Sequence, residues 1–304
     1  MIRKPPHIRP GARFGVISPC SPVNPGIVEA GIRELELRGY DVVFAPHSWD
    51  ADGHRAGSAR DRAADLMQFY AEPDVDVIWC ARGGSSACLM REHIDWDVLS
   101  GLPPKLVIGF SDVSSLHVPL TQRLKVPSIH GPLLFHVGRV IGDEELSWLL
   151  RLLEDPTAPR HVPGAATDTI VPGTTEGRLC GGCLSLIRNT IGTPDQIDAT
   201  DGIFLIEDID EKPWGIERDL FHLREAGILA KAKGIVIGEA SNADDSKTVS
   251  MARIWREMLE PLGVPCVSGF PFGHVSPNWA LPLGCLARLD ADQRTLRLLE
   301  APVV

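Results

Sequence analysis

The sequence lacks a run of about eighteen apolar residues, the length that a membrane-spanning helix requires, so no segment is predicted to cross a bilayer. Residues 1–7 form neither an apolar core nor a small-residue cleavage site, so a secretory signal is not expected. The 7 cysteines are too few for a disulfide framework in a chain of 304 residues, and an odd number fits a reducing compartment. We therefore expect a cytoplasmic protein.

Positive charge is also scarce. Lys and Arg number 30 against 40 Asp and Glu, and the formal net charge of −10 disfavours binding to nucleic acids and to anionic membranes. Neither is expected as a partner. The chain has no H-E-x-x-H motif and no pair of C-x-x-C motifs, so we expect no metal and no other cofactor. Residues 82–86 are glycine-rich but lack the lysine and the spacing of a phosphate-binding loop.

The first half of the chain alternates short apolar runs with segments of helical periodicity. Four strands are predicted, at 13–17, 41–45, 75–80 and 105–110. Helices are predicted between and after them, at 26–38, 57–71 and 112–124. This alternation predicts an α/β fold, in which helices cover both faces of a parallel sheet.

The alternation stops at residues 137–170, and we place a domain boundary at 140–170. The prediction is a first domain over 1–150 and a second over 165–304. Further strands are predicted in the second domain at 202–206, 234–237 and 264–267, with helices at 216–229 and 248–262 and a hairpin of 286–290 with 295–299.

Ser111 is a candidate nucleophile because it lies where a predicted strand ends and a helix begins, the edge at which α/β sheets bind ligands. Backbone amides at a helix start stabilise negative charge, and the amide of Asp112 is the nearest donor. Gly84, in the glycine-rich turn after the third strand, is a candidate second donor. The alternative is that Ser111 only caps the helix, since Val113 replaces the last glycine of the G-x-S-x-G motif.

A serine nucleophile needs a base and an acid that orients the base. His274 lies in a turn-rich loop after a predicted strand, where catalytic side chains concentrate. Glu207 is the first acid after the apolar run 202–206, so it is the one that a strand end would hold in place. The alternative for this acidic cluster is a solvated loop. The chain order Ser, Glu, His is known among such triads.

Taken together, these segments resemble the LD-carboxypeptidase family of serine peptidases, which includes the microcin C self-immunity peptidases. The similarity spans about residues 13–285. The matching segments are GVISPCSP at 15–22, ARGG at 81–84, GFSDVSSLH at 109–117, HGP at 130–132, GGCLS at 181–185, GTP at 192–194, LIED at 205–208 and GFPFGH at 269–274.

The resemblance implies roles for the candidate residues. The family nucleophile falls on Ser111, the glutamate on Glu207 and the histidine on His274, and the oxyanion donors correspond to the amides of Asp112 and Gly84. It also implies a Rossmann-like N-terminal domain, a smaller β-rich C-terminal domain and a homodimer, with the catalytic residues divided between the domains.

The resemblance further implies a small peptide substrate. In murein recycling the family cleaves the amide between meso-diaminopimelate and the terminal D-alanine of the tetrapeptide; the alternative is a microcin C-like immunity peptidase that cleaves an aminoacyl-nucleotide amide. Arg82 and Arg218 are candidates for the substrate carboxylate, and each is equally compatible with an ordinary surface arginine. The family often has R-G-G-Y-G where this chain has RGGSS at 82–86, so the substrate contacts differ at this point.

Two functions of other classes have partial support in the sequence. Cys180 and Cys183 have the C-x-x-C spacing of thiol redox proteins, but their segment lacks the βαβ setting of that motif. A non-catalytic ligand-binding α/β domain is also compatible with the fold, because function depends on the site.

Overall fold

The computed structural model describes residues 2–157, 160–243 and 249–304, and the chain divides into two compact units. The first unit comprises Met1–Pro156 and Pro302–Val304, and the second comprises Thr157–Ala301. The last residues belong to the first unit because the amide of Val304 donates to the carbonyl of Pro5, and the amide of His7 donates to the carbonyl of Val304, each at 2.9 Å. In the described residues no helix is long and apolar enough to cross a membrane.

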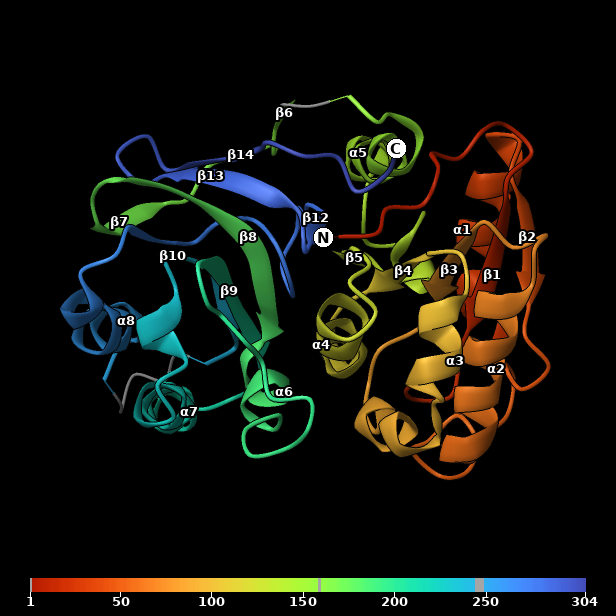
Figure 1. The fold of residues 1–304 in the computed structure, drawn as a ribbon, viewed down its shortest axis with the longest axis horizontal. Helices are drawn as coiled ribbons and strands as arrows, with labels where there is room; N and C mark the ends of the chain where they lie inside the picture. Colours follow the sequence, from red (N-terminus) through yellow and green to blue (C-terminus); the bar gives the residue numbers. More distant parts are fainter. Residues whose placement is uncertain (1, 158–159, 244–248) are drawn as a thin grey trace. The chain divides into compact units, whose positions relative to one another are not determined.

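The first unit contains a parallel sheet in which β5, β4, β3, β1 and β2 lie side by side in that order (Figure 1). These strands are β1 (Arg13–Ile17), β2 (Asp41–Phe44), β3 (Val77–Cys80), β4 (Leu106–Gly109) and β5 (Ser128–His130). The α-helices are α1 (Pro25–Leu37), α2 (Ala59–Ala71), α3 (Trp96–Gly101), α4 (Ser114–Gln122) and α5 (Asp143–Glu154). Short 3-10 helices are η1 (Ala87–His93), η2 (Ser111–Val113) and η3 (Leu134–His136).

The central strands β3 and β4 are apolar and buried along their whole length, as expected for strands of a parallel sheet that is covered on both faces. One face packs in a core with residues of α2, α3 and α4, among them Leu66, Leu99 and Leu116. On the strands, residues of the opposite parity, such as Phe14 and Trp79, are fully buried too. Because β3 and β4 are parallel neighbours, their carboxyl ends lie next to each other at one edge of the sheet. There the chain continues into η1 after β3 and into η2 after β4.

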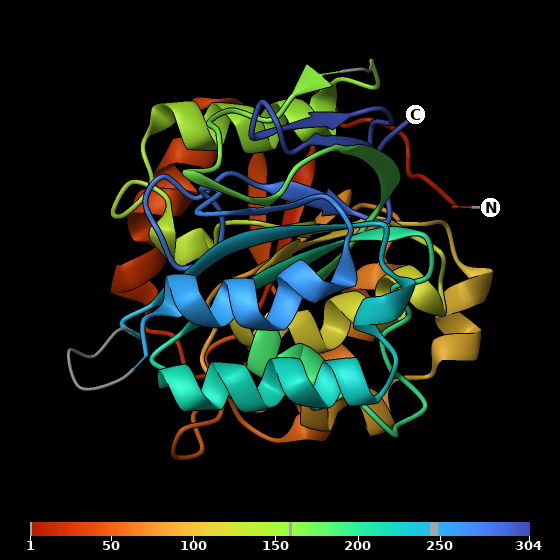
Figure 2. The ribbon, with the colours of Figure 1, turned by 90° about the vertical axis from the view of Figure 1, so that its left-hand side faces the viewer.

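The second unit contains a mixed sheet with the strand order β6-β14-β13-β8-β9-β10-β11-β7. The strands of this sheet are β6 (Arg160–His161), β7 (Asp168–Val171), β8 (Thr174–Cys183), β9 (Gly202–Ile209), β10 (Gly234–Ser241), β11 (Cys266–Ser268), β13 (Leu286–Asp290) and β14 (Thr295–Leu298). A further short strand of this part of the chain, β12 (Leu281–Leu283), does not belong to it. The helices are α6 (Leu184–Arg188), α7 (Pro213–Glu225), η4 (Leu229–Lys231), α8 (Met251–Leu259) and η5 (Glu260–Leu262). The strands from β8 to β11 are parallel, whereas the pairs at both ends of the sheet are antiparallel. Figure 2 shows α7 and α8 side by side across this unit.

The predicted fold class is confirmed: the chain is α/β, with a parallel N-terminal sheet and a β-rich second part. The strand β8 was not predicted, because its first half is polar and half-exposed and carries no apolar run. The predicted helix at 248–262 starts outside the described residues, and its described part is α8 followed by η5.

Candidate active site

Ser111 is the first residue of η2, and one residue, Phe110, separates it from the end of β4. Its backbone is in the left-handed region with φ of 64°. A residue other than glycine costs about 1–2 kcal/mol there, and such strain concentrates at functional sites. The same sharp strand-to-helix turn exposes the serine of a nucleophile elbow. Neither η2 nor α4 has a side-chain capping bond, so the alternative role of Ser111 as a helix cap is not observed.

The turn formed by Gly83 and Gly84 packs against this serine. A Cβ atom on Gly83 would lie 3.3 Å from Ser111 Oγ, and one on Gly84 would clash with Ser21 Oγ. Gly84 has φ of +124°, a conformation that side chains rarely adopt. The absence of a side chain at Gly83 therefore lets this turn lie close to the Ser111 hydroxyl, and the next residue, Gly84, is the one whose amide is predicted to donate to a developing oxyanion.

The carboxylate of Asp112 binds the segment that follows β3. It is 4% exposed and accepts a 2.6 Å hydrogen bond from the amide of Ala87. Burial raises its pKa, while the bond from Ala87 and the nearby charge of Arg62 oppose the rise. The buried Arg62 guanidinium donates to the carbonyls of Ser86, at 3.0 Å, and Pro19. The bond of Asp112 ties the segment after β3 to the turn that carries Ser111, and Arg62 ties the segments after β1 and β3 to α2.

In the second unit, His274 and Glu207 form a hydrogen-bonded pair. Glu207 belongs to β9 and is 1% exposed, and its Oε2 lies 2.6 Å from His274 Nδ1. The imidazole is mostly buried, with 13% of its side chain exposed. Because Nδ1 faces a carboxylate, it carries the proton, and Nε2 is left as the basic nitrogen.

The pKa of His274 is raised. Burial lowers it, but the hydrogen bond and charge of Glu207, with the charges of Asp208 and Asp210, outweigh burial. Burial also raises the pKa of Asp208 to about 6, although its carboxylate accepts bonds from the amides of Ser185 and Ile209. Glu207 and Asp208 are 1% and 3% exposed, so the alternative of a solvated loop is wrong for these two acids.

Loop contacts that the sequence did not indicate hold the histidine in place. Ser241 Oγ donates to the carbonyl of His274 at 2.8 Å, and the amide of Gly273 donates to Asn278 Oδ1 at 2.9 Å. Neither Ser241 nor Asn278 lies in a segment with a recognisable pattern. Their contribution depends on the folded loop.

The Glu207 carboxylate is packed closely against Gly273. A Cβ atom on Gly273, which has φ of +92°, would lie 2.6 Å from Glu207 Oε2. Gly11 has a similar φ of +87° with no atom within 4 Å of its Cβ position. We expect Gly11→Ala to cost about 1 kcal/mol of unfolding free energy through strain alone. Gly273→Ala should cost clearly more in urea unfolding, because the carboxylate must move; equal losses in both variants would contradict this packing.

The two arginines proposed for substrate binding are exposed. Arg82 donates to the carbonyl of Pro22 at 3.1 Å, and Arg218, on α7, lies 3.3 Å from Asp219 Oδ1. Asp219 is buried and also pairs with Arg188 at 3.2 Å, so Arg218 is anchored at its Nε atom by a carboxylate that it shares with a second arginine. Their role stays a prediction.

The structure argues against a redox role for Cys180 and Cys183. Both thiols are on β8, and burial raises the pKa of Cys180 to about 12 and that of Cys183 well above its ordinary value. A thiol that stays protonated at neutral pH is a poor nucleophile for disulfide exchange.

Comparison with known proteins places these residues within matched segments. Residues 14–131 match the LD-carboxypeptidase N-terminal domain and residues 176–289 match the LD-carboxypeptidase C-terminal domain. A Bacillus subtilis protein named "probable murein peptide carboxypeptidase" is 31% identical, over 96% of this chain and 93% of its own. The murein tetrapeptide carboxypeptidase of Pseudomonas aeruginosa is 28% identical, over 92% and 94%.

Solved structures share the fold. The wild-type microcin C7 self-immunity protein MccF superposes with a TM-score of 0.91 at 20% identity and covers 100% of both chains. A muramoyltetrapeptide carboxypeptidase from Oxalobacter formigenes gives a TM-score of 0.84 at 27% identity, over 94% of this chain and 98% of its own.

Proposed function

Because the chain belongs to the LD-carboxypeptidase family, we propose that it is a serine peptidase that hydrolyses murein tetrapeptide between meso-diaminopimelate and the terminal D-alanine. The observation that carries the proposal is the buried 2.6 Å pair of Glu207 and His274. In that pair the carboxylate faces Nδ1, so Nε2 is the ring nitrogen proposed to take up a proton, and Ser111, with its left-handed backbone after a strand, is the proposed source of the hydroxyl.

In the proposed reaction, Ser111 Oγ attacks the carbonyl carbon of the scissile amide, and its proton passes to Nε2 of His274. Glu207 stabilises the imidazolium that forms. The oxyanion accepts hydrogen bonds from the amides of Asp112 and Gly84, and loss of one such donor typically costs about 3 kcal/mol. His274 then protonates the departing amine of D-alanine. Water, activated by the same histidine, hydrolyses the acyl-enzyme and restores the serine.

The carboxylate of D-alanine needs a cationic partner, and we assign that role to Arg82 and Arg218. We further propose that the protein acts in the cytoplasm as a homodimer.

The second candidate is hydrolysis of an aminoacyl-nucleotide amide, because a solved MccF structure contains aspartyl sulfamoyl adenosine. The murein reaction is preferred for one reason. The relatives named for murein peptides are 28% and 31% identical to this chain, whereas the curated microcin immunity protein of Escherichia coli is 22% identical.

The test compares the two candidate substrates with each other and with a stereochemical control. Purified protein is incubated with murein tetrapeptide, with its isomer ending in L-alanine, and with aspartyl sulfamoyl adenosine, and the released amino acid is quantified by chromatography. We expect release of D-alanine at a kcat/KM at least about 100-fold above the other two reactions. Faster cleavage of the nucleotide conjugate would replace the murein assignment with the second candidate.

The pH dependence should reflect the raised pKa of His274. Only the neutral imidazole accepts the serine proton, so kcat/KM should fall as the pH drops through a value above 6.5, the ordinary pKa of histidine. Removing the acid in Glu207→Gln leaves burial, which lowers the pKa, so the His274 titration should shift to lower pH. NMR titration of the His274 ring in both proteins measures this shift. A titration that does not move would contradict the proposed pairing.

A further inference from the structure

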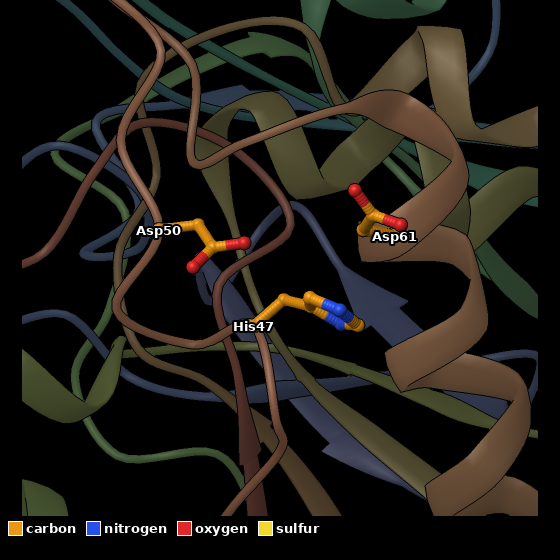
Figure 3. A group of neighbouring side chains, drawn as sticks. All are labelled: His47, Asp50 and Asp61. Atoms are coloured by element: carbon orange, nitrogen blue, oxygen red, sulfur yellow. The ribbon is translucent and has the colours of Figure 1, made fainter.

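A second group of titratable side chains lies in the first unit, apart from the residues discussed so far. His47 and Asp50 follow β2, and Asp61 is in the first turn of α2. One potential ligand atom from each residue lies within 4.8 Å of the others. Figure 3 shows the polar ends of the three side chains turned toward a common region.

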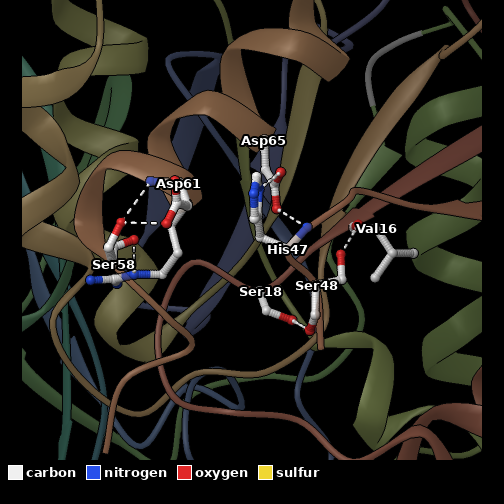
Figure 4. A network of polar contacts seen from close by, with 8 residues as sticks. Val16, Ser18, His47, Ser48, Ser58, Asp61 and Asp65 are labelled. Atoms are coloured by element: carbon white, nitrogen blue, oxygen red, sulfur yellow. Dashed lines mark hydrogen bonds and ion pairs between the residues drawn. The ribbon is translucent and has the colours of Figure 1, made fainter. Parts of the chain in front are cut away.

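The ring of His47 is held by a buried acid. Asp65 is 2% exposed, and its Oδ1 lies 2.8 Å from His47 Nδ1, while its Oδ2 accepts from the amide of His47 at 3.2 Å (Figure 4). A carboxylate on one ring nitrogen fixes the orientation of a metal-binding histidine and raises the basicity of the other nitrogen. Nε2 of His47 is therefore the nitrogen available to a cation.

The backbone around the donors is fixed as well. Ser48 Oγ donates to the carbonyl of Val16 at 2.9 Å, and Ser18 Oγ donates to the carbonyl of Ser48 at 2.7 Å (Figure 4). On α2, Ser58 caps the helix by accepting from the amide of Asp61 at 3.1 Å, and its hydroxyl donates to Asp61 Oδ2 at 2.6 Å. The side chains of His47 and Asp61 are thus held in place before any ion binds.

The local charge favours a cation. Within residues 2–157, neither Asp50 nor Asp61 forms an ion pair with an arginine or a lysine. The nearest acid and base in the same loop, Asp52 and Arg55, are paired with each other at 2.6 Å. Two carboxylates and a histidine whose second nitrogen is bonded to a third carboxylate therefore share one small region.

We propose that His47, Asp50 and Asp61 form a binding site for a divalent transition-metal ion, best matched by Zn²⁺. One imidazole nitrogen and two carboxylate oxygens are ligands that zinc accepts, with water in the fourth position. Asp65 is a positioning residue that orients His47. The bound ion joins the loop after β2 to the start of α2, which makes the site structural, and it does not rest on the proposed peptidase activity.

A competing explanation is that a protonated His47 offsets the acids without an ion, and metal titration separates the two. Tag-free protein, stripped with a chelator, is titrated with Zn²⁺ by calorimetry and with Co²⁺ by visible absorption. We expect saturable binding of one ion. His47→Ala, Asp50→Asn and Asp61→Asn should each weaken it at least about 10-fold, and Asp65→Asn by about 10- to 100-fold.

Asp52→Asn is the matched control, because it changes an exposed acid of the same loop whose partner is Arg55. It should bind zinc as the unchanged protein does. Asp50 is exposed, so Asp50→Asn keeps the test valid even if a buried variant fails to fold. The absence of saturable zinc binding would overturn the proposal. Equal zinc affinity in Asp50→Asn and the unchanged protein would overturn it too, because zinc bound elsewhere, for example by cysteines, is insensitive to this substitution.

Discussion

Replacing Glu207 with glutamine is expected to lower kcat by about 10⁴-fold, and replacing His274 with alanine by at least as much. The glutamine fills the same buried space, but it can donate to His274 Nδ1 and so stabilise the wrong tautomer. Without the negative charge, the imidazolium formed during attack loses its stabilising partner. The rate of D-alanine release at saturating tetrapeptide measures the effect.

Glu211→Gln provides the control for this pair. Glu211 belongs to the same acidic cluster, but it lies after the strand end and is partly exposed. Its substitution should change kcat by less than about threefold, as surface changes usually do little. If Glu211→Gln reduced the rate as much as Glu207→Gln, the 2.6 Å bond to His274 would not be the cause.

Replacing Ser111 with alanine should have the largest effect, a fall in kcat of about 10⁶-fold, because no other atom can form the acyl-enzyme. The fold should persist, since alanine meets the same left-handed strain as serine at φ of 64°. Ser115→Ala is the matched control, because Ser115 lies in α4, the helix that directly follows η2. Its Oγ is buried with no hydrogen-bond partner in the described part of the chain, so its loss should preserve both stability and rate.

Two results would contradict the role of Ser111. One is turnover by Ser111→Ala within about tenfold of the unchanged enzyme, since removing a true nucleophile costs far more. The other is an equal loss in Ser115→Ala, which would point to damage to α4. Circular dichroism and thermal unfolding of both variants establish that the comparison is between folded proteins.

The strands could be predicted from the sequence where burial requires a continuous run of apolar residues. The apolar runs that became β1, β4 and β9 were predicted because a strand covered on both faces cannot carry exposed polar groups. Glu207 could be selected among several acids for the same reason, since it directly follows an apolar run. Strand β8 was missed because its outer half alternates polar residues.

The geometry of the sites could not be predicted in the same way. The left-handed backbone of Ser111 is set by tertiary packing, and local pattern equally allowed a helix cap. The buried Arg62, which binds the carbonyls of Pro19 and Ser86, could not be predicted either, because it is far from Ser111 in the sequence and belongs to no motif. The group of His47, Asp50 and Asp61 has a spacing that matches no known ligand pattern, and only folding brings its donors together.

The central claim is that His274 activates Ser111, and covalent labelling tests it most directly. A fluorophosphonate reacts with a serine only when a base removes the hydroxyl proton, and peptide mass spectrometry identifies the modified residue. The account predicts that Ser111 is the labelled serine in the unchanged protein and that His274→Ala slows its labelling by at least about 10³-fold. Equal labelling rates in the two proteins, or labelling at another serine only, would contradict it.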